Sequence, residues 1–492
     1  MGQVEVIERH VLTCADEDKI AALESPYKFG ALEDLVFPFV PVENVFVYPQ
    51  SADQELVSVD RLKQALSSVL NYYPHLTGRL QFDEQTKSPE INRLDTGCEL
   101  HVAKCSARIN DLVSHKSGRL LVTDLPGSGA DLTPPFDPSL EGVCRDPILA
   151  VQHTRFACGG VTLGVRTHHI AADACSIFQF SRDLAEMYRN IATGAHETTL
   201  SNPPVIRSYL QGSVSALSEE ERSKALQYNP PGLYVDDTPP IEIPEESAES
   251  TKPSVVGHVL RFTSDELKEI KQTATDPEGN NWVSTFEALS AYLAQKVYQA
   301  RVELLESEGK IASEHLSSGV FSALNVRDLD RLNLPPAYFP NAFYAVNTAI
   351  PHETYTNGPL WKVAKAIHTA IRSIDQDTIK QTVDWVAAQP DKSRIRFKNF
   401  TLAEGNTTLT QWSRYNMYID MYFDHDRNGT PIHPILSTPP FTVTTRIEGL
   451  AIFIATEKQL SKTEYPPSLD VLLSLSNPLW NTSSLKHIAD KL

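Results

Sequence analysis

Alternation of apolar and polar positions marks the clearest strands of this 492-residue chain. In 161–167 branched apolar residues occupy every second position, and 148–157 alternates in the same way. We therefore predict two strands joined by a short turn. The spacing of the apolar positions then changes. In 174–190 they recur at helical spacing, which predicts an amphipathic helix. A strand gives way to a helix between residues 167 and 174.

The same two periods recur along the rest of the chain. Helical spacing predicts further helices at Val59–Leu70, about 286–305, 360–374 and 376–388. Alternation predicts strands in the second half at 257–262, 320–326, 394–402, 409–420, 441–448 and 450–455. Between 191 and 255, paired prolines and an acidic run predict a long surface crossover. We therefore expect an N-terminal domain at 1–192, a crossover at 193–254 and a C-terminal domain at 255–492.

Composition narrows the class of protein and its partners. The net charge of −18 argues against nucleic acid or an anionic membrane as a general partner. No apolar run reaches the roughly 18 residues of a membrane span, and 1–19 lacks the apolar core of a signal peptide. The six cysteines include no Cys-x-x-Cys pair, which fits reduced thiols better than a disulfide framework or a zinc site. We expect a cytoplasmic protein.

The junction between the strand and the helix carries His168, His169 and Asp173. Adjacent residues on an extended chain point to opposite faces, so the two histidines cannot easily share a metal, and we expect no metal site. The positive end of the following helix disfavours the imidazolium form, so a histidine here stays neutral and can act as a general base. Asp173 has two interpretations: a helix N-cap, or an ion pair that fixes the loop holding the histidine.

This junction resembles a family motif. It reads His168-His169-Ile170-Ala171-Ala172-Asp173-Ala174, which is similar to the His-x-x-x-Asp motif of the BAHD superfamily of coenzyme A-dependent acyltransferases, including its hydroxycinnamoyltransferases. The resemblance covers nearly the whole chain. Its other matching segments are the turn that ends in Gly78-Arg79-Leu80, the helix start at 283–289, Asn325-Val326-Arg327, Tyr338-Phe339-Pro340-Asn341-Ala342 and Trp412.

The resemblance implies a fold and a reaction. The fold is α/β, with two similar chloramphenicol-acetyltransferase-like domains, each a mixed β-sheet flanked by helices, and a channel between them. Acyl-CoA is the implied co-substrate, with no permanently bound cofactor, and the acceptor is a small alcohol or amine of specialised metabolism. A monomer is expected. The implied catalytic set is His169 as general base with Asp173 and Trp412, and His168 is a packing or orienting neighbour.

Trp412 has two interpretations in this scheme. By resemblance, its indole N–H is the candidate donor to the tetrahedral oxyanion. The alternative is an aromatic side chain that packs in a buried strand.

The chain departs from the family pattern in three places. Ala174 stands where the family has glycine after the motif aspartate, and Pro340 replaces the glycine of Tyr-Phe-Gly-Asn-Ala. The second family motif, Asp-Phe-Gly-Trp-Gly, has lost its glycines and its tryptophan in 418–426. The resemblance implies a structural salt bridge between the aspartate of that motif and Arg327. We therefore expect Arg327 to pair with Asp420 or Asp424.

Coenzyme A carries phosphates, so a local basic or N–H-rich contact is expected despite the acidic chain. Arg394 and Arg396 belong to a run, 392–398, that would place four cations on one face of a strand. A charged sheet edge is the alternative. Ser284 and Thr285 precede the long helix, whose N-terminus favours anions, and plain helix caps are the alternative there.

Two other functions compete with acyl-CoA-dependent transfer. A non-catalytic relative would keep the fold and bind a partner or metabolite, which the altered second motif supports and the intact His169 and Asp173 oppose. A condensation-type enzyme would use thioesters on carrier proteins, but no carrier domain accompanies this chain.

Overall fold

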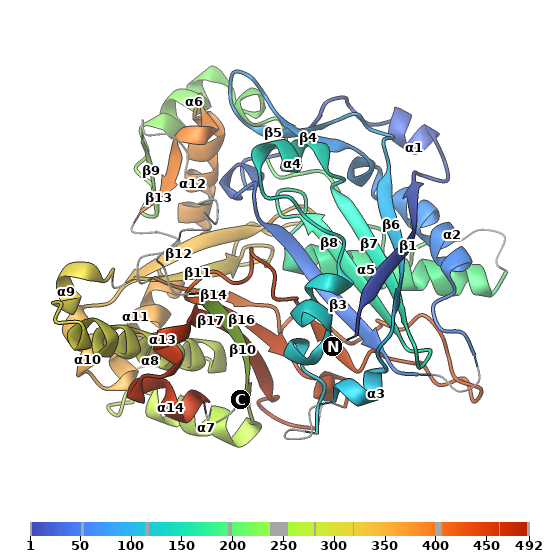
Figure 1. Ribbon diagram of the computed structural model, residues 1–492. Helices are drawn as coiled ribbons and strands as arrows, with labels where there is room; N and C mark the ends of the chain where they lie inside the picture. The colour runs from blue at the N-terminus through green and yellow to red at the C-terminus, as the bar shows by residue number, and fades with distance from the viewer. Residues whose placement is uncertain are drawn as a thin grey trace.

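The computed structural model (Figure 1) describes residues 2–50, 54–113, 118–194, 199–236, 254–279, 282–317, 319–398, 406–461 and 463–489. Two six-stranded sheets form its frame, and two small sheets accompany them. Both large sheets contain parallel and antiparallel neighbours, as the mixed sheets of the expected fold require. The small sheets are β2 (Tyr27–Lys28), β5 (Pro89–Asn92) and β4 (Arg79–Phe82), and the pair β13 (Ile395–Phe397) and β9 (Leu233–Val235).

The first large sheet holds the strand that leads to the two histidines. Its order is β1 (Val4–Leu12), β6 (Cys98–Cys105), β7 (Leu149–Phe156), β8 (Val161–His168), β3 (Pro41–Tyr48) and β15 (Leu436–Thr438). Helices α2 (Val59–Leu70) and α5 (Ala174–Ala192) pack on one face, where the rings of Phe46 and Phe178 meet edge to face with their centroids 6.2 Å apart. The predicted strand and helix on either side of the junction are confirmed.

The second large sheet is built from strands after residue 254. Its order is β10 (Val255–Phe262), β17 (Leu469–Ser476), β16 (Leu450–Ala455), β14 (Thr407–Gln411), β11 (Gly319–Asn325) and β12 (Phe343–Ala349). The longer helices of this half are α7 (Ser264–Thr273), α8 (Thr285–Ser307), α11 (Leu360–Arg372) and α12 (Gln376–Ala388). In Figure 1, α7 and α8 lie on the side of this sheet away from the first sheet.

Side chains of the second sheet divide cleanly between its two faces. Ala451 and Phe453 of β16 pack in the core that contains α8, whereas Ile452 and Ile454 pack in the core of the first half. Because successive strand residues point to opposite faces, one face of the second sheet is turned toward the first half of the chain. A substrate channel between the halves would run along that face.

The chain crosses back into the first half after β14. Trp412, Met417 and Tyr418 belong to the core of the first half, and β15 pairs with β3 at the edge of the first sheet. Two strand predictions are therefore wrong. The strand expected at 409–420 ends at Gln411, because the chain turns away from the second sheet there, and 441–448 is a run of turns.

The remaining elements are short or lie between the two halves. They are α1 (Asp18–Ala21), α3 (Ile109–Leu112), α4 (Leu140–Arg145), α6 (Glu219–Leu226), α9 (Ala312–His315), α10 (His352–Thr356), α13 (Asn477–Trp480) and α14 (Ser483–Ala489). The described part of the expected crossover holds α6 and β9, and β9 pairs with β13 of the second half. Among the described residues, no helix has the length and apolar character needed to cross a membrane.

Candidate active site

His168 is the last residue of β8 and is fully buried. Its ring lies 5.2 Å from the ring of Phe136, measured between centroids, and neither ring nitrogen has a hydrogen-bond partner among the described residues. Burial, helped by the nearby Arg166 guanidinium, holds the pKa of His168 far below its usual value. This histidine is neutral and enclosed, as a packing neighbour should be.

His169 follows β8 and faces the second half of the chain. Its amide donates to the carbonyl of Val40 at 3.2 Å, and its ring lies 5.8 Å from the ring of Phe343 at the start of β12. Burial is the main cause that lowers the pKa of His169 below its usual 6.5, so the ring is neutral at pH 7. Within the described part of the chain, Nδ1 is enclosed and has no hydrogen-bond partner, which leaves Nε2 as the ring nitrogen that could meet a ligand.

Asp173 does both structural tasks that the sequence allowed. It is the N-cap of α5, where its carboxylate accepts a hydrogen bond from the Ser176 amide at 3.1 Å. Its two oxygens also face Arg327, which donates from Nη1 at 2.8 Å and from Nη2 at 3.0 Å. Burial raises the pKa of Asp173, but the Arg327 charge and the hydrogen bonds outweigh burial and leave that pKa below its usual value.

The expected partners of Arg327 are therefore wrong. Asp420 is exposed in a turn with φ of +62°, and Asp424 accepts hydrogen bonds from the Val57 amide at 2.7 Å and from Arg61 at 3.5 Å. The reason is the path of the chain after Gln411. It carries 418–426 to α2 in the first half, whereas Arg327 follows β11 and meets Asp173 at the junction.

A loop of the second half, 338–342, holds the junction from the other side. Asn341 is fully buried, and its amide nitrogen donates to the carbonyls of His169 at 2.8 Å and Ile170 at 2.6 Å. The Ala342 amide donates to Asp173 at 3.1 Å, and the Pro340 carbonyl accepts from Arg327 at 2.7 Å. The sequence signal for this clamp is the Tyr338-Phe339-Pro340-Asn341-Ala342 match, whose role the sequence alone does not reveal.

Trp412 lies directly after β14 and is 8% exposed. Its ring meets Phe178 of α5 with centroids 5.9 Å apart, and its amide donates to the carbonyl of Phe453 at 2.8 Å. Among the described residues, its indole N–H has no hydrogen-bond partner. The side chain packs against the helix that starts at Asp173, which agrees with the packing interpretation and leaves the indole N–H available as a donor.

The residues expected at the coenzyme A phosphates occupy two separate places. Ser284 is the N-cap of α8, and Thr285 is its first residue. The carboxylate of Glu287 accepts the Ser284 amide at 2.6 Å, while the Ser284 hydroxyl accepts the Glu287 amide at 3.1 Å. A carboxylate therefore already sits at this helix N-terminus, which is the arrangement of a plain capping box.

The cationic run 392–398 does not form one face of a strand, so that prediction is wrong. Lys392 is buried and its ammonium donates to three carbonyls at the end of α12, at 2.6 to 2.8 Å. Arg394 lies in the turn before β13, and Arg396 is in that three-residue strand, where it donates to the carbonyls of Ser393 at 2.5 Å and Ile395 at 3.0 Å. Lys392 therefore caps the end of α12 and does not extend the strand.

Comparison with protein families matches residues 3–430 to the Transferase family. The chain belongs to the BAHD superfamily of acyltransferases. Shikimate O-hydroxycinnamoyltransferase of Nicotiana tabacum is 25% identical over 398 residues, which cover 80% of this chain and 83% of that protein. Rosmarinate synthase of Plectranthus scutellarioides is 25% identical over 359 residues, covering 72% of this chain and 73% of that protein.

Solved structures show that this BAHD acyltransferase has the expected fold. Vinorine synthase superposes with a TM-score of 0.65 over 97% of this chain and 96% of its own, at 18% identity. F. sporotrichioides TRI101, solved in complex with coenzyme A and T-2, superposes with a TM-score of 0.61 over 94% of this chain and 96% of its own, at 16% identity.

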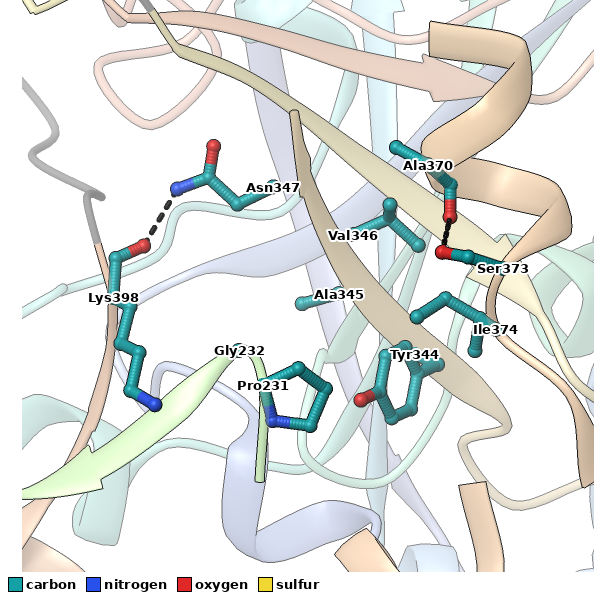
Figure 2. Close-up of a pocket in the computed structure, with 10 residues that line it drawn as sticks. All are labelled: Pro231, Gly232, Tyr344, Ala345, Val346, Asn347, Ala370, Ser373, Ile374 and Lys398. Carbon is teal, nitrogen blue, oxygen red and sulfur yellow. Dashed lines mark hydrogen bonds between the residues drawn. The ribbon is translucent and has the colours of Figure 1, made fainter. Parts of the chain in front are cut away.

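Two further features of this BAHD acyltransferase bear on its chemistry. Among the described residues, no group of three or more histidine, cysteine or acidic side chains is placed to hold a metal ion. A cavity of about 150 Å³ opens beside the outer edge of β12, where Ala345 and Asn347 face Gly232 and Lys398 (Figure 2). His169 does not line it, but Phe343, which touches the His169 ring, is the first residue of the same strand.

Proposed function

We propose that this acyltransferase moves an acyl group from acyl-CoA to the hydroxyl or amine of a small metabolite, with His169 as general base. The observation that carries the proposal is the setting of His169, whose lowered pKa keeps the ring neutral near pH 7 and whose backbone carbonyl Asn341 holds where the two halves meet. The names of relatives support a hydroxycinnamoyl donor, and they include both an O-transferase and an N-transferase. Acetyl and malonyl donors fit the same chemistry.

The reaction is a direct transfer within a ternary complex. His169 Nε2 takes the proton of the acceptor as the acceptor oxygen or nitrogen attacks the thioester carbon. The tetrahedral oxyanion accepts a hydrogen bond from the Trp412 indole N–H, which the packing against Phe178 holds in place. Collapse breaks the carbon–sulfur bond, and the coenzyme A thiolate recovers the proton from the His169 imidazolium. Asp173 acts through Arg327 by holding the loop.

The phosphates of coenzyme A need a cationic contact. We propose Arg394 and Arg396 ahead of Ser284 and Thr285, because Glu287 already places a negative charge at the start of α8. Replacement of each arginine by glutamine should raise the KM for acyl-CoA without changing the KM for the acceptor. A Ser284→Ala variant with a raised acyl-CoA KM and unchanged stability would reverse this order.

The test measures free thiol released from acetyl-CoA, malonyl-CoA and hydroxycinnamoyl-CoA against a panel of alcohols and amines. We expect transfer by the wild type and a loss of about 10²- to 10⁴-fold in kcat for His169→Ala. His315→Ala, an exposed histidine of α9, is the matched control. Transfer that survives His169→Ala unchanged would refute the base assignment.

Two outcomes would favour the competing functions. Absence of transfer from every CoA donor, together with tight binding of a protein or metabolite, would favour a non-catalytic relative. Transfer from a carrier-protein thioester but not from CoA would favour a condensation-type enzyme.

We further propose that the protein works as a monomer in the cytoplasm. This proposal rests on the family resemblance. Light scattering tests the oligomeric state, and cell fractionation tests the location.

A further inference from the structure

Phe339 reaches from the second half of the chain into the core of the first half. The side chain of Tyr338 packs in the core of the second half, whereas that of Phe339 is fully buried in the core of the first. Two rings meet Phe339 edge to face, Tyr73 at 4.7 Å and His75 at 5.7 Å, measured between centroids. Phe339 therefore seats the loop 338–342 in an aromatic pocket of the other half.

Helix α5 presents a row of side chains to this pocket. The Ser176 hydroxyl donates to the carbonyl of Phe339. One turn further along the helix, the Phe180 ring meets the Tyr73 ring with centroids 5.3 Å apart. Residues three or four apart lie on the same face of a helix, so Asp183 is the next residue of this row.

Asp183 ends the row and is 8% exposed. Its carboxylate accepts a hydrogen bond from the Tyr73 hydroxyl. Arg182 and Glu186 are its charged neighbours, but Arg182 donates to the carbonyl of Asn416 at 3.2 Å. The Tyr73 hydroxyl is therefore the group that holds this carboxylate, and the bond fixes the place of the Tyr73 ring.

This buried carboxyl group lowers the stability of the fold near neutral pH. Burial is the main cause that raises the pKa of Asp183 to about 7, well above the ordinary aspartate value of about 3.9. Folding therefore opposes the ionised form, and an apolar side chain in the same space would avoid that cost. A hydrogen bond between two buried side chains instead requires one arrangement of the groups that form it.

We propose that Tyr73 and Asp183 are positioning residues of the acyl transfer: they hold Phe339 in its pocket and thereby hold the loop that fixes the base. The inference rests on the proposed function and adds two residues that act on the base through other residues. Asn341, two residues after Phe339, donates to the carbonyl of His169 at 2.8 Å. A shift of Phe339 reaches Asn341 because only a proline, with its fixed φ, separates them.

The test removes the hydroxyl of each of two tyrosines and keeps the rings. Tyr73→Phe removes the hydrogen bond to Asp183 and leaves a ring in the pocket. Tyr188→Phe is the matched control, because Tyr188 is equally buried and its hydroxyl also meets an aspartate, Asp424, at 3.5 Å. The Tyr188 ring packs against Phe423, with centroids 5.3 Å apart, so this control leaves the pocket intact. Thermal unfolding checks that each variant folds.

We expect Tyr73→Phe to lower kcat by about tenfold and to change the KM for acyl-CoA and for the acceptor by less than about twofold. The reason is that misplacement of the base affects the transition state more than substrate binding. Tyr188→Phe should keep the wild-type kcat. Wild-type kcat in folded Tyr73→Phe, or an equal fall in Tyr188→Phe, would overturn the proposal.

Variants of Asp183 test whether the two residues act as a unit. Asp183→Ala should lower kcat as Tyr73→Phe does, and the double variant should lose no more than the larger single loss. Asp183→Asn keeps an oxygen that can accept from the Tyr73 hydroxyl, so it should recover most of the kcat. Losses that multiply in the double variant would overturn the proposal that the pair acts together.

If the wild type transfers no acyl group, the proposed function fails and the positioning contacts are tested without turnover. Amide hydrogen exchange, read by mass spectrometry, then compares the peptides that cover 168–173 and 338–342. We expect faster exchange of both segments in Tyr73→Phe and wild-type exchange in Tyr188→Phe. Wild-type exchange of both segments in Tyr73→Phe would overturn the inference.

Discussion

Two adjacent histidines at the end of β8 have opposite surroundings. His168 is fully enclosed with Phe136 over its ring, while His169 is half-buried beside Phe343 and keeps Nε2 accessible. The strand parity read from the sequence predicted that they would point to different faces. It could not predict which face was enclosed, because the segment that covers His168 comes from a different part of the chain.

The acid side of the pH profile should report His169. Because burial lowers its pKa, the ring stays neutral as pH falls through the range in which an exposed histidine would become protonated. We expect kcat/KM to fall only below pH about 6.5, as the base form is lost. The measurement is a pH–rate profile from pH 4 to 9 with a stable donor, and a limb centred above pH 7 would contradict it.

Asp173 and Asp420 make a matched pair for testing the observed ion pair. Asp173→Asn leaves the Arg327 side chain, which is 13% exposed, without its carboxylate, so we expect a loss of about 3 kcal/mol in the free energy of unfolding. Asp420→Asn, at an exposed position, should change it by less than about 0.5 kcal/mol. Urea unfolding at pH 7 measures both.

Equal effects of the two substitutions would contradict the pairing.

The ion pair also makes stability depend on pH in a definite direction, because the pKa of Asp173 is lowered on folding. The stability it contributes is present above the ordinary aspartate pKa of about 3.9 and is lost as pH falls through the lowered value. The sequence could not identify this partner, because Arg327 and Asp173 are brought together only by the packing of one half on the other.

At the scale of the elements, the loop 338–342 holds the backbone of His169, the proposed base, from the opposite half of the chain. Asn341 bonds two successive carbonyls of the junction, and nothing in its spacing from His169 along the sequence shows this. Helix and strand periods were predictable, since Val59–Leu70 and 174–190 bury the residues that their patterns mark as apolar. Contacts between a loop of one half and the other half leave no periodic pattern in the sequence. The match of 338–342 to the family was therefore the only sequence sign of these contacts.

Asn341→Ala should therefore separate positioning from binding. Loss of two buried hydrogen bonds costs about 1–3 kcal/mol of stability and lets the His169 backbone shift. We expect kcat to fall by about tenfold or more, with little change in either KM, because misplacement of the base affects the transition state. Steady-state kinetics measures this split, with Asn416→Ala, whose side chain is exposed, as the control.

An equal fall in kcat for Asn416→Ala, or a rise in KM alone for Asn341→Ala, would contradict the positioning role.

Two strand predictions failed because contacts between the halves, which the local sequence pattern does not show, decide the structure there. The alternation in 409–420 and 441–448 is real, but β14 stops at Gln411 and the following residues pack in the other half. Long-range packing overrides local alternation at those positions.

At the scale of the whole molecule, Glu43 of β3 connects the two halves. Its carboxylate accepts a hydrogen bond from Thr442 at 3.2 Å, and burial raises its pKa to about 7 although Arg166 opposes this. Folding therefore favours the protonated form, and stability is lost as pH rises from the ordinary glutamate pKa of about 4.3 to that raised value. The loss is about 1.4 kcal/mol per pH unit.

Glu43→Gln should remove that part of the pH dependence. Relative to the wild type, we expect the variant to gain about 2–3 kcal/mol in the free energy of unfolding between pH 5 and pH 8. Urea unfolding at both pH values measures the difference. A variant whose stability relative to the wild type is the same at pH 5 and pH 8 would show that Glu43 is ionised in the folded protein.

The pairing of β15 with β3 has a consequence for how the protein is made. Residues 436–438 complete the edge of the first sheet, and Tyr418 and Phe423 complete its core, yet they leave the ribosome long after the strands of that sheet at 4–168. During synthesis the first half therefore emerges with one sheet edge and part of its core uncovered. The junction that carries His169 stays without its Asn341 clamp until the second half has folded, so we expect the proposed base to act only after that step.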